Sequence, residues 1–477
     1  MNKLFFLSSI LICTMINPFE LFAQQESLQI GRSKVYPVGK IFKYAQRKSE
    51  ISDIDQWLQV RKIVAERKEE YLKNGWINPV KSHPKFILPL HIKDVITDPG
   101  YYTITAYFDH DTLFPYNWQD YTCGFLTYDL ESGYNHEGTD FFLWPYPWYK
   151  MANNEVEVIA AAPGILLQKQ DGNFDQHCEL NSEEWNGVCI LHDDGSTSWY
   201  IHMKKNSLTD KNVGEEIVQG EYLGIVGSSG SSLAPHLHFE VLDADENKID
   251  PFFGPCNEAI GDSWWEEQLP YKEPGVNKIS TNTHLPVFPD CPEEEIPNES
   301  DVFYPGDSIF LLSYFRNISW GDQAEVTIRR PNNSVFANWF WTNPYDFYAA
   351  SWVYFFMFIN EENYGIWNYQ LSYNGSTYNK NFELKNPQGT TYHSDQDQLK
   401  IFPVPFENMI TLESTNFQRS GSLIKIYNSM GQWIRNIQIN PNLDSAIQLD
   451  LSNLPSGIYF ISLEFGNENL YKRIVKK

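Results

Sequence analysis

Long basic runs are missing from this sequence, and so are long apolar stretches beyond its first residues. It has 36 Lys and Arg against 61 Asp and Glu among 477 residues, a formal net charge of -25 at pH 7. Such acidity opposes charge-driven binding to nucleic acid or other anionic polymers, so no nucleic-acid partner is expected. After the first 23 residues no uninterrupted apolar stretch of about 18 residues occurs. We therefore expect no transmembrane segment in the mature chain.

The first 23 residues have the features of an export signal. Lys3 precedes an apolar run from Leu4 to Met15 that is too short to cross a bilayer, and Ala23 offers a small residue at a cleavage point. We expect residues 1–23 to be a signal peptide, and the mature protein to enter an oxidising compartment in which disulfides form.

Cysteine is scarce: the sequence has 6, and one of them lies in the expected signal peptide. The others are Cys123, Cys178, Cys189, Cys256 and Cys291. Five thiols cannot all pair within one chain. Cys178 and Cys189 flank a polar segment and are candidates to close a hairpin, and Cys256 with Cys291 is the second candidate pair.

The mature sequence divides into four regions. Residues 24–88 are polar, with apolar residues at helical spacing up to Gly75, and form either a helix packed on a larger domain or a removable prosegment. Residues 89–284 alternate short strands with glycine-containing turns. The pattern of residues 285–388 predicts an immunoglobulin-like β-sandwich, and that of residues 399–477 predicts a small β-sandwich. With 16% aromatic residues, the expected fold class is mainly β, with a compact antiparallel β domain ahead of the two sandwiches.

Histidine is also scarce, with 11 in the sequence, yet two stand together in "APHLHFEV". Successive side chains of a strand point to opposite faces, so His236 and His238 share one face. By itself, such a pair is as often two exposed histidines on an edge strand as it is part of a functional site. Upstream, "HEGTD" places His136 and Asp140 four residues apart around a Glu-Gly turn, close enough to bind one ion.

These residues match the needs of a catalytic zinc ion, which takes three nitrogen or oxygen ligands and leaves a fourth position to water. His136, Asp140 and one histidine of the pair complete that set. The other histidine of the pair, and His202 in "WYIHM", would then be bases beside the metal.

In their order along the chain, "HEGTD", "WYIHM" and "GIVGSSGSSLAPHLHFEV" resemble the lysostaphin/LytM-type zinc endopeptidases, which cut peptide bonds in bacterial cell walls. The resemblance implies a compact antiparallel β-domain with the site in a groove, and peptidoglycan peptides as substrate. It implies one zinc ion, bound by His136, Asp140 and His238, with His202 and His236 as the catalytic histidines. Those two would orient or deprotonate the attacking water and stabilise the oxyanion.

Other segments carry weaker expectations. The aromatic insertion Phe141 to Glu155 departs from the family pattern, and either walls the groove or packs on the N-terminal region. "GSSGSS", Gly227 to Ser232, lacks the lysine of a phosphate-binding loop and is expected to form a mobile rim. His192 is expected to have a structural or solvent role, and the acidic connector Glu293 to Glu295 to be solvated.

The last region has a resemblance of its own. "IFPVPFENMITLE", "SGIY" and the closing "YKRIVKK" look like the C-terminal sorting domain of type IX secretion cargo, although Pro403, Val404 and Pro405 stand where the family usually has PNP. This implies a Gram-negative host, passage through the periplasm, handling by the type IX secretion machinery, and a secreted or cell-surface location.

Two alternative functions stay open. Trp339, Trp341 or Trp352 could stack on a sugar in a non-catalytic adhesin or glycan-binding protein, although core packing is the commoner fate of such residues. A metallopeptidase could also act on another, Gly-rich protein, which the acidic charge favours because an anionic wall would repel it.

Overall fold

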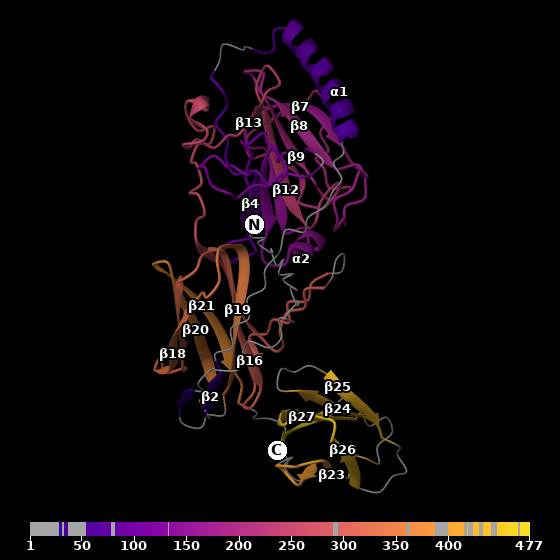
Figure 1. Cartoon of the computed structure of the whole chain (residues 1–477), viewed down its shortest axis with the longest axis vertical. Coiled ribbons are helices and arrows are strands. Elements are labelled where there is room, and N and C mark those ends of the chain that lie inside the picture. Colours follow the sequence, from indigo (N-terminus) through magenta and orange to yellow (C-terminus); the bar gives the residue numbers. More distant parts are fainter. Residues whose placement is uncertain are drawn as a thin grey trace, which may run out of the picture. The chain divides into compact units, whose positions relative to one another are not determined.

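The computed structural model describes most of the chain after the expected signal peptide. The described residues are 28–30, 33–36, 54–77, 82–131, 133–289, 294–359, 363–386, 399–414, 417, 423–428, 433–439, 446–465 and 468–477. The chain divides into two units, Met1–Lys385 and Asn386–Lys477 (Figure 1). The signal-peptide prediction falls on residues outside the described ones. Among the described residues, no helix has the length and apolar character needed to span a membrane.

Antiparallel β-sheets dominate the structure, which confirms the expected fold class. An eight-stranded sheet of order β10-β7-β8-β9-β12-β5-β4, with β13 paired to β12, faces a three-stranded sheet of order β11-β6-β3. The strands of these two sheets are β3 (Leu90–Ile92), β4 (Tyr102–Ala106), β5 (Thr139–Leu143), β6 (Val156–Ile159), β7 (Gly164–Gln170), β8 (Gly187–Leu191), β9 (Thr197–Ile201), β10 (Glu216–Ile217), β11 (Tyr222–Ile225), β12 (His236–Leu242) and β13 (Lys248–Ile249). Apolar side chains of both sheets, among them Phe141, Leu237 and Val158, form one buried core.

The helix predicted in the N-terminal region is α1, Ile54–Lys73, and Gly75 follows it with a left-handed φ of 71°. It packs on the face of the eight-stranded sheet that points away from the core between the sheets. Val64 is fully buried in a cluster with Trp199 of β9, whereas the next residue of that strand, Tyr200, points into the core. The helix is therefore a packed part of this domain, beside β7 and β8 in Figure 1.

A second pair of sheets forms a β-sandwich within the same unit. Their orders are β1-β2-β19-β16-β14 and β15-β21-β20-β17-β18. The strands are β1 (Leu28–Ile30), β2 (Ser33–Tyr36), β14 (Gly275–Asn282), β15 (Val302–Phe303), β16 (Ser308–Ile318), β17 (Gln323–Arg329), β18 (Val335–Thr342), β19 (Tyr348–Phe358), β20 (Gly365–Tyr373) and β21 (Ser376–Leu384). Their inner faces bury a common core that includes Trp367 and Tyr369. Two strands from the N-terminal region thus join the sandwich through β19.

The aromatic insertion Phe141 to Glu155 joins the two parts of this unit. It contains the short helix α2, Pro147–Ala152, and its apolar side chains share a buried cluster with the sandwich. The rings of Trp144 and Tyr146 lie 6.0 and 5.3 Å from the ring of Tyr314 in β16, measured between centroids. The buried partner of the insertion is therefore the sandwich, which neither of our two expectations anticipated.

The second unit is a smaller pair of sheets, of orders β22-β23-β26 and β25-β24-β27-β28. The strands are β22 (Lys400–Phe402), β23 (Met409–Glu413), β24 (Leu423–Asn428), β25 (Trp433–Gln438), β26 (Ala446–Asp450), β27 (Gly457–Phe465) and β28 (Glu468–Lys476). Ile410, Ile424 and Ile461 lie in the core that the two sheets share.

Both disulfide pairings expected from the sequence are wrong. Cys123 is bonded to Cys256, which spans a sequence separation of 133. Cys189 is a free, buried thiol in the cluster under α1, so it cannot close a hairpin with Cys178. Spacing along the chain does not reveal these partners, because residues far apart in sequence meet only after the sheets form. Cys178 is itself disulfide-bonded, and Cys291 lies outside the described residues.

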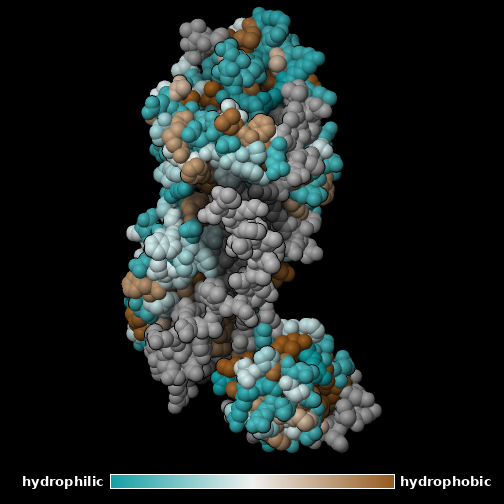
Figure 2. Space-filling model, in the orientation of Figure 1, coloured by the Kyte–Doolittle hydropathy of each residue, from teal (hydrophilic) through white to brown (hydrophobic). Residues whose placement is uncertain are grey.

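Figure 2 shows that the visible face of the part that contains α1 and the eight-stranded sheet is mostly hydrophilic, with hydrophobic residues scattered over it. The acidic connector Glu293 to Glu295 was expected to be solvated, and this expectation is wrong for one of its residues. Glu294 is exposed, but Glu295 is only 2% exposed, and its Oε2 accepts a hydrogen bond from the backbone N–H of Tyr149 at 2.6 Å. The insertion therefore buries one carboxylate of the connector.

Candidate active site

Three neighbouring elements of the eight-stranded sheet bring the predicted site residues together. Strand β12 lies between β5 and β9, and its His238 is directly opposite Asp140 of β5 and Ile201 of β9. His136 comes from the turn before β5. His202 follows β9 with a left-handed φ of 67°, which takes its ring out of the strand alternation and places it beside His236.

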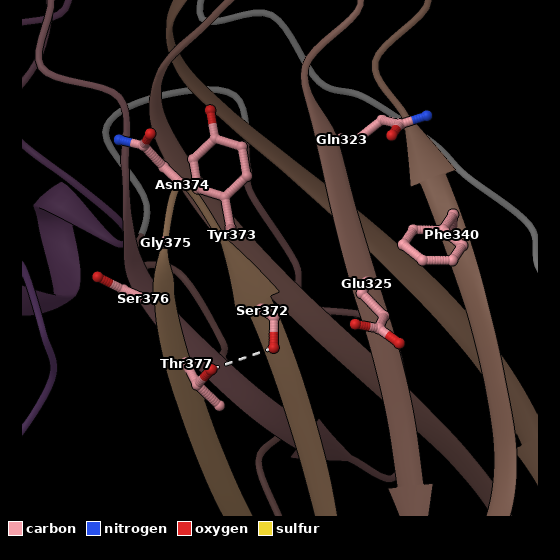
Figure 3. A pocket seen from close by; sticks show the side chains of 9 residues that line it. All are labelled: Gln323, Glu325, Phe340, Ser372, Tyr373, Asn374, Gly375, Ser376 and Thr377. Atoms are coloured by element: carbon pink, nitrogen blue, oxygen red, sulfur yellow. Dashed lines mark hydrogen bonds between the residues drawn. The ribbon is translucent and has the colours of Figure 1, made fainter.

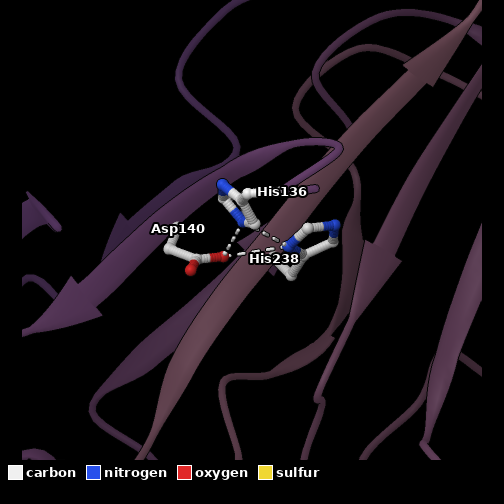
Figure 4. A group of neighbouring side chains, drawn as sticks. All are labelled: His136, Asp140 and His238. Atoms are coloured by element: carbon white, nitrogen blue, oxygen red, sulfur yellow. Dashed lines mark hydrogen bonds and ion pairs between the residues drawn. The ribbon is translucent and has the colours of Figure 1, made fainter. Parts of the chain in front are cut away.

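The three predicted metal ligands form one compact cluster (Figure 4). His136 Nε2 lies 3.1 Å from Asp140 Oδ1 and 3.2 Å from His238 Nδ1, and His238 Nδ1 lies 2.9 Å from Asp140 Oδ1. The three residues are buried, with exposures of 0%, 7% and 5% in that order. Among the described residues, this is the one cluster of His, Cys, Asp and Glu with the spacing of metal ligands.

The donor atoms of this cluster fit a cation. His136 Nδ1 donates to the backbone carbonyl of Tyr107 at 2.7 Å, so its Nε2 presents a lone pair to the cluster. That lone pair points toward the Asp140 carboxylate and His238 Nδ1. Because electron-rich atoms that converge in this way repel one another, they are stable together only with a positive charge between them. Two imidazoles and a carboxylate are also the kind of set that catalytic zinc takes.

The pKa directions agree with this need for positive charge. Although burial lowers it, the hydrogen bond to Asp140 and the nearby carboxylates of Asp140 and Glu240 raise the pKa of His238 to about 9, so these surroundings favour a positive charge at this ring. Burial raises the pKa of Asp140, but the neighbouring His136 and His236 hold it well below its usual range. The carboxylate is therefore ionised and available as a ligand.

The two predicted catalytic histidines lie beside the cluster and are held by backbone carbonyls. His202 Nδ1 donates to the carbonyl of Ser229 at 2.6 Å, and His236 Nδ1 donates to that of Ala234 at 2.8 Å. Their ring centroids are 4.6 Å apart, and His236 Nε2 lies 3.7 Å from Asp140 Oδ1. Burial lowers the pKa of His236, and burial together with His236 and His238 holds that of His202 well below its usual range. Both rings are therefore neutral near pH 7, with Nε2 free to accept a proton.

The segment Gly227 to Ser232 holds the ring of His202 through the carbonyl of Ser229. The expectation that this segment forms a mobile rim is wrong. Five of its six residues are buried, and its serines donate hydrogen bonds inward: Ser228 Oγ to the carbonyl of His177 at 2.8 Å, and Ser229 Oγ to that of Met203 at 2.9 Å. Small residues are needed here because the chain passes close to neighbouring backbone, and a Cβ on Gly227 would lie 2.5 Å from Lys204 N.

Two residues of the site were not identified from the sequence. A Cβ on Gly138 would lie 2.8 Å from His238 Nε2, so only glycine lets this ring fit. Glu240 is 1% exposed and its Oε2 lies 3.9 Å from His238 Nε2. A signal for Glu240 was present, because the alternation that places His236 and His238 on one face places residue 240 there as well.

The other residues singled out from the sequence lie elsewhere. His192 is buried, with its ring nitrogens 2.8 Å from the Pro163 carbonyl and 2.9 Å from Ser198 Oγ, outside the cluster. Trp352 is 2% exposed in the cluster shared with the insertion. Trp339 and Trp341 are half-buried against the sandwich core.

A shallow hollow of about 340 Å³ lies on the sandwich (Figure 3), with the exposed ring of Phe340 and the carboxylate of Glu325 among its lining residues. The hollow lies on β17, β18, β20 and β21, whereas Asp140 and His238 of the predicted metal site lie on β5 and β12. The sandwich therefore presents a phenylalanine to solvent at this hollow, and none of the three tryptophans proposed as sugar platforms lines it.

Two family models match the chain. Residues 135–251 match Peptidase family M23, and residues 400–477 match the Secretion system C-terminal sorting domain. The chain thus carries a metallopeptidase domain of family M23 that contains all five predicted site residues. It also carries a C-terminal sorting domain, which marks it as a secreted or cell-surface protein.

Curated relatives match the same stretch. The glycyl-glycine endopeptidase ALE-1 of Staphylococcus capitis is 31% identical over 109 residues, which is 23% of this chain and 25% of the relative. Lysostaphin of Staphylococcus simulans is 29% identical over 109 residues, 23% of this chain and 18% of that protein. The chain therefore spans a quarter or less of the length of these relatives.

Solved structures give weaker matches. Dimeric latent PorU from Porphyromonas gingivalis matches with a TM-score of 0.18 and 9% identity, over 66% of this chain and 34% of that one. The titin Ig tandem domains A164-A165 match with a TM-score of 0.14 and 12% identity, over 43% of this chain and 95% of that one. Scores this low do not show a shared fold.

Proposed function

We propose that this protein is a secreted zinc endopeptidase that hydrolyses peptide bonds in bacterial cell-wall peptidoglycan. The observation that carries the proposal is the convergence of His136 Nε2, Asp140 Oδ1 and His238 Nδ1 within about 3 Å of one another, with two neutral histidines beside them. Two imidazoles and one carboxylate suit zinc, and as a group they leave positions for water and substrate.

The chain's own residues divide the work around that ion. A zinc ion bound here would supply Lewis-acid activation of water and of the scissile carbonyl. One of the two rings, His202 or His236, accepts the single proton of the attacking water at Nε2, because both Nδ1 atoms are committed to the carbonyls of Ser229 and Ala234. Once protonated, Nε2–H donates to the developing oxyanion. The buried Asp140 carboxylate offsets the positive charge that accumulates.

The substrate class rests on the relatives. The name of one relative specifies glycyl-glycine bonds, so we propose that this chain also cuts between small residues in wall peptides. A Gly-rich protein outside the wall is the second candidate, since a net charge of -25 disfavours adsorption to an anionic wall.

The test is to incubate the purified full chain with peptidoglycan and, separately, with a glycine-rich protein, and to identify new amino termini by mass spectrometry. We expect new termini from peptidoglycan, none with the His236→Ala variant, and none after zinc is chelated. Release from the glycine-rich protein alone would select the second candidate, and release by the His236→Ala variant would show that another site is responsible.

We propose the following division of the chain, on sequence patterns. Residues 1–23 are a signal peptide, 24–88 an N-terminal region, 89–284 the metallopeptidase domain, 285–388 the immunoglobulin-like sandwich and 399–477 the sorting domain recognised by the type IX machinery. Strand β14 (Gly275–Asn282) is an exception to these bounds, because it pairs with β16 in a sheet of the sandwich. Mass spectrometry of the protein from culture medium would give the mature ends.

A further inference from the structure

We propose that Arg61 of helix α1 and Glu240 of strand β12 act together as positioning residues for the metal ligand His238. The proposal rests on the metal centre described above, and it extends that centre to a helix outside the matched residues 135–251.

Glu240 lies on the side of His238 that points away from the ligand cluster. The two side chains share one face of β12, and the Glu240 side chain is 1% exposed. His238 Nδ1 is 2.9 Å from Asp140 Oδ1, whereas the other ring nitrogen, Nε2, is 3.9 Å from Glu240 Oε2. The carboxylate therefore faces the nitrogen that does not point toward the cluster.

A histidine that binds a metal through one nitrogen carries its proton on the other, and the partner of that N–H fixes both the tautomer and the ring angle. At 3.9 Å the present contact is an ion pair rather than a hydrogen bond. Gly138 has no side chain and so leaves the Nε2 edge of the ring unobstructed, and a ring turned toward Glu240 would shorten this contact. Glu240 can then accept from Nε2–H and direct Nδ1 to the metal.

Arg61 keeps Glu240 in this position. Its Nη2 lies 2.5 Å from Glu240 Oε1 and 3.0 Å from Glu137 Oε2. Burying a carboxylate without a cation beside it is strongly unfavourable. The guanidinium of Arg61 therefore allows Glu240 to stay ionised although its side chain is buried next to His238. Glu137 directly follows His136, and Lys248 pairs with its other oxygen. Arg61 thus joins the turn that carries one ligand to the strand that carries another.

This arrangement makes α1 part of the metal centre, in addition to its packing role. Arg67 on the same helix supplies a matched control, because it is bonded to the Leu167 carbonyl at 2.8 Å and to Gln168 Oε1 at 2.5 Å, on β7 rather than at the site. Removing Arg61 should affect zinc binding, whereas removing Arg67 should affect only the attachment of the helix.

The experiment measures the zinc dissociation constant of the full chain by competition with a chelator, together with the unfolding temperature of the metal-free protein. The variants are Glu240→Gln, Arg61→Gln, Arg61→Lys, Arg67→Gln and the double variant Arg61→Gln/Glu240→Gln. We expect Glu240→Gln to weaken zinc binding about 10- to 100-fold, the usual effect of removing a partner of a metal ligand. Arg61→Gln should weaken it several-fold, Arg61→Lys should recover part of the loss, and Arg67→Gln should leave it within about two-fold.

The double variant separates coupling from general damage. If the two residues act as one unit, it binds zinc about as well as Glu240→Gln alone, because Arg61 acts through Glu240. Additive losses, or an Arg67→Gln loss equal to that of Arg61→Gln, would show a merely structural role and overturn the proposal. So would zinc binding unchanged by Glu240→Gln. A wild-type chain that binds no zinc would instead refute the proposed function.

Discussion

The Nδ1 atom of His202 donates a hydrogen bond of 2.6 Å to the backbone carbonyl of Ser229, in the "GSSGSS" segment that precedes the HxH strand. This one bond fixes the tautomer of the ring and leaves Nε2 as a base beside the cluster of ligands. The serine-rich segment therefore has a role at the site, because it carries the carbonyl that orients His202, which we propose as a catalytic histidine.

Replacing His202 by alanine should reduce turnover far more than zinc binding. Loss of one group that stabilises the transition state costs about 3 kcal/mol, or a 10²- to 10³-fold lower kcat, while the three ligands remain in place. Zinc content and kcat measured on the same preparation check this, with the exposed His284→Ala as control. Normal turnover in the variant would remove His202 from the mechanism.

The Cys123–Cys256 disulfide should stabilise the metallopeptidase domain substantially. It closes a loop that contains the three predicted metal ligands and the two predicted catalytic histidines, and a disulfide across a sequence separation of 133 contributes up to about 5 kcal/mol in the chain-entropy account. We expect Cys123→Ser, Cys256→Ser and the double variant to lower the unfolding temperature by a similar amount. A double variant much less stable than either single variant would mean that the two cysteines contribute independently.

Stability should fall with rising pH because of Glu295. Burial raises the pKa of this carboxyl from 4.5 to about 7, so the folded state holds the proton more tightly than the unfolded chain does. Its contribution is complete below pH 4.5 and is lost as pH rises through about 7.

The Glu295→Gln variant cannot ionise and should keep its stability over this range. Its advantage over the wild type should grow from near zero at pH 4.5 to at most about 3 kcal/mol at pH 8.5. Calorimetry at both pH values measures this difference, and an advantage of equal size at the two values would argue against titration of Glu295.

The sandwich and the metallopeptidase domain should unfold together. Trp352 is 2% exposed in the cluster that joins them, so Trp352→Ala should cost about 3 to 5 kcal/mol and lower the temperature at which bound zinc is released. Trp320, which is 73% exposed, is the matched control, and its replacement should change neither quantity. If the Trp352→Ala variant releases zinc at the wild-type temperature, the two parts are independent.

Local patterns predicted much of this molecule. Alternation placed His236 and His238 on one face, helical spacing predicted α1, and the ordered motifs predicted that His136, Asp140 and His238 converge. These features depend on residues near one another in sequence, or on a resemblance that already contains the long-range contacts.

Long-range partners outside the family pattern were not predictable in this way. Cys123 meets Cys256, the insertion meets β16, and Arg61 meets Glu240 only because separate strands and a helix pack together. The spacing of apolar residues along the chain gives no information about contacts between residues so far apart in the sequence. Glu295 shows the same limit, since an acidic run gives no sign that one of its members is buried under the insertion.

The most direct test of the account measures zinc content and peptidoglycan hydrolysis in the full chain and in its His238→Ala variant. We predict one zinc ion per wild-type chain and release of wall peptides, with both lost in the variant. A wild-type chain that cuts peptidoglycan without binding zinc, or a variant that still binds zinc and cuts, would contradict the account.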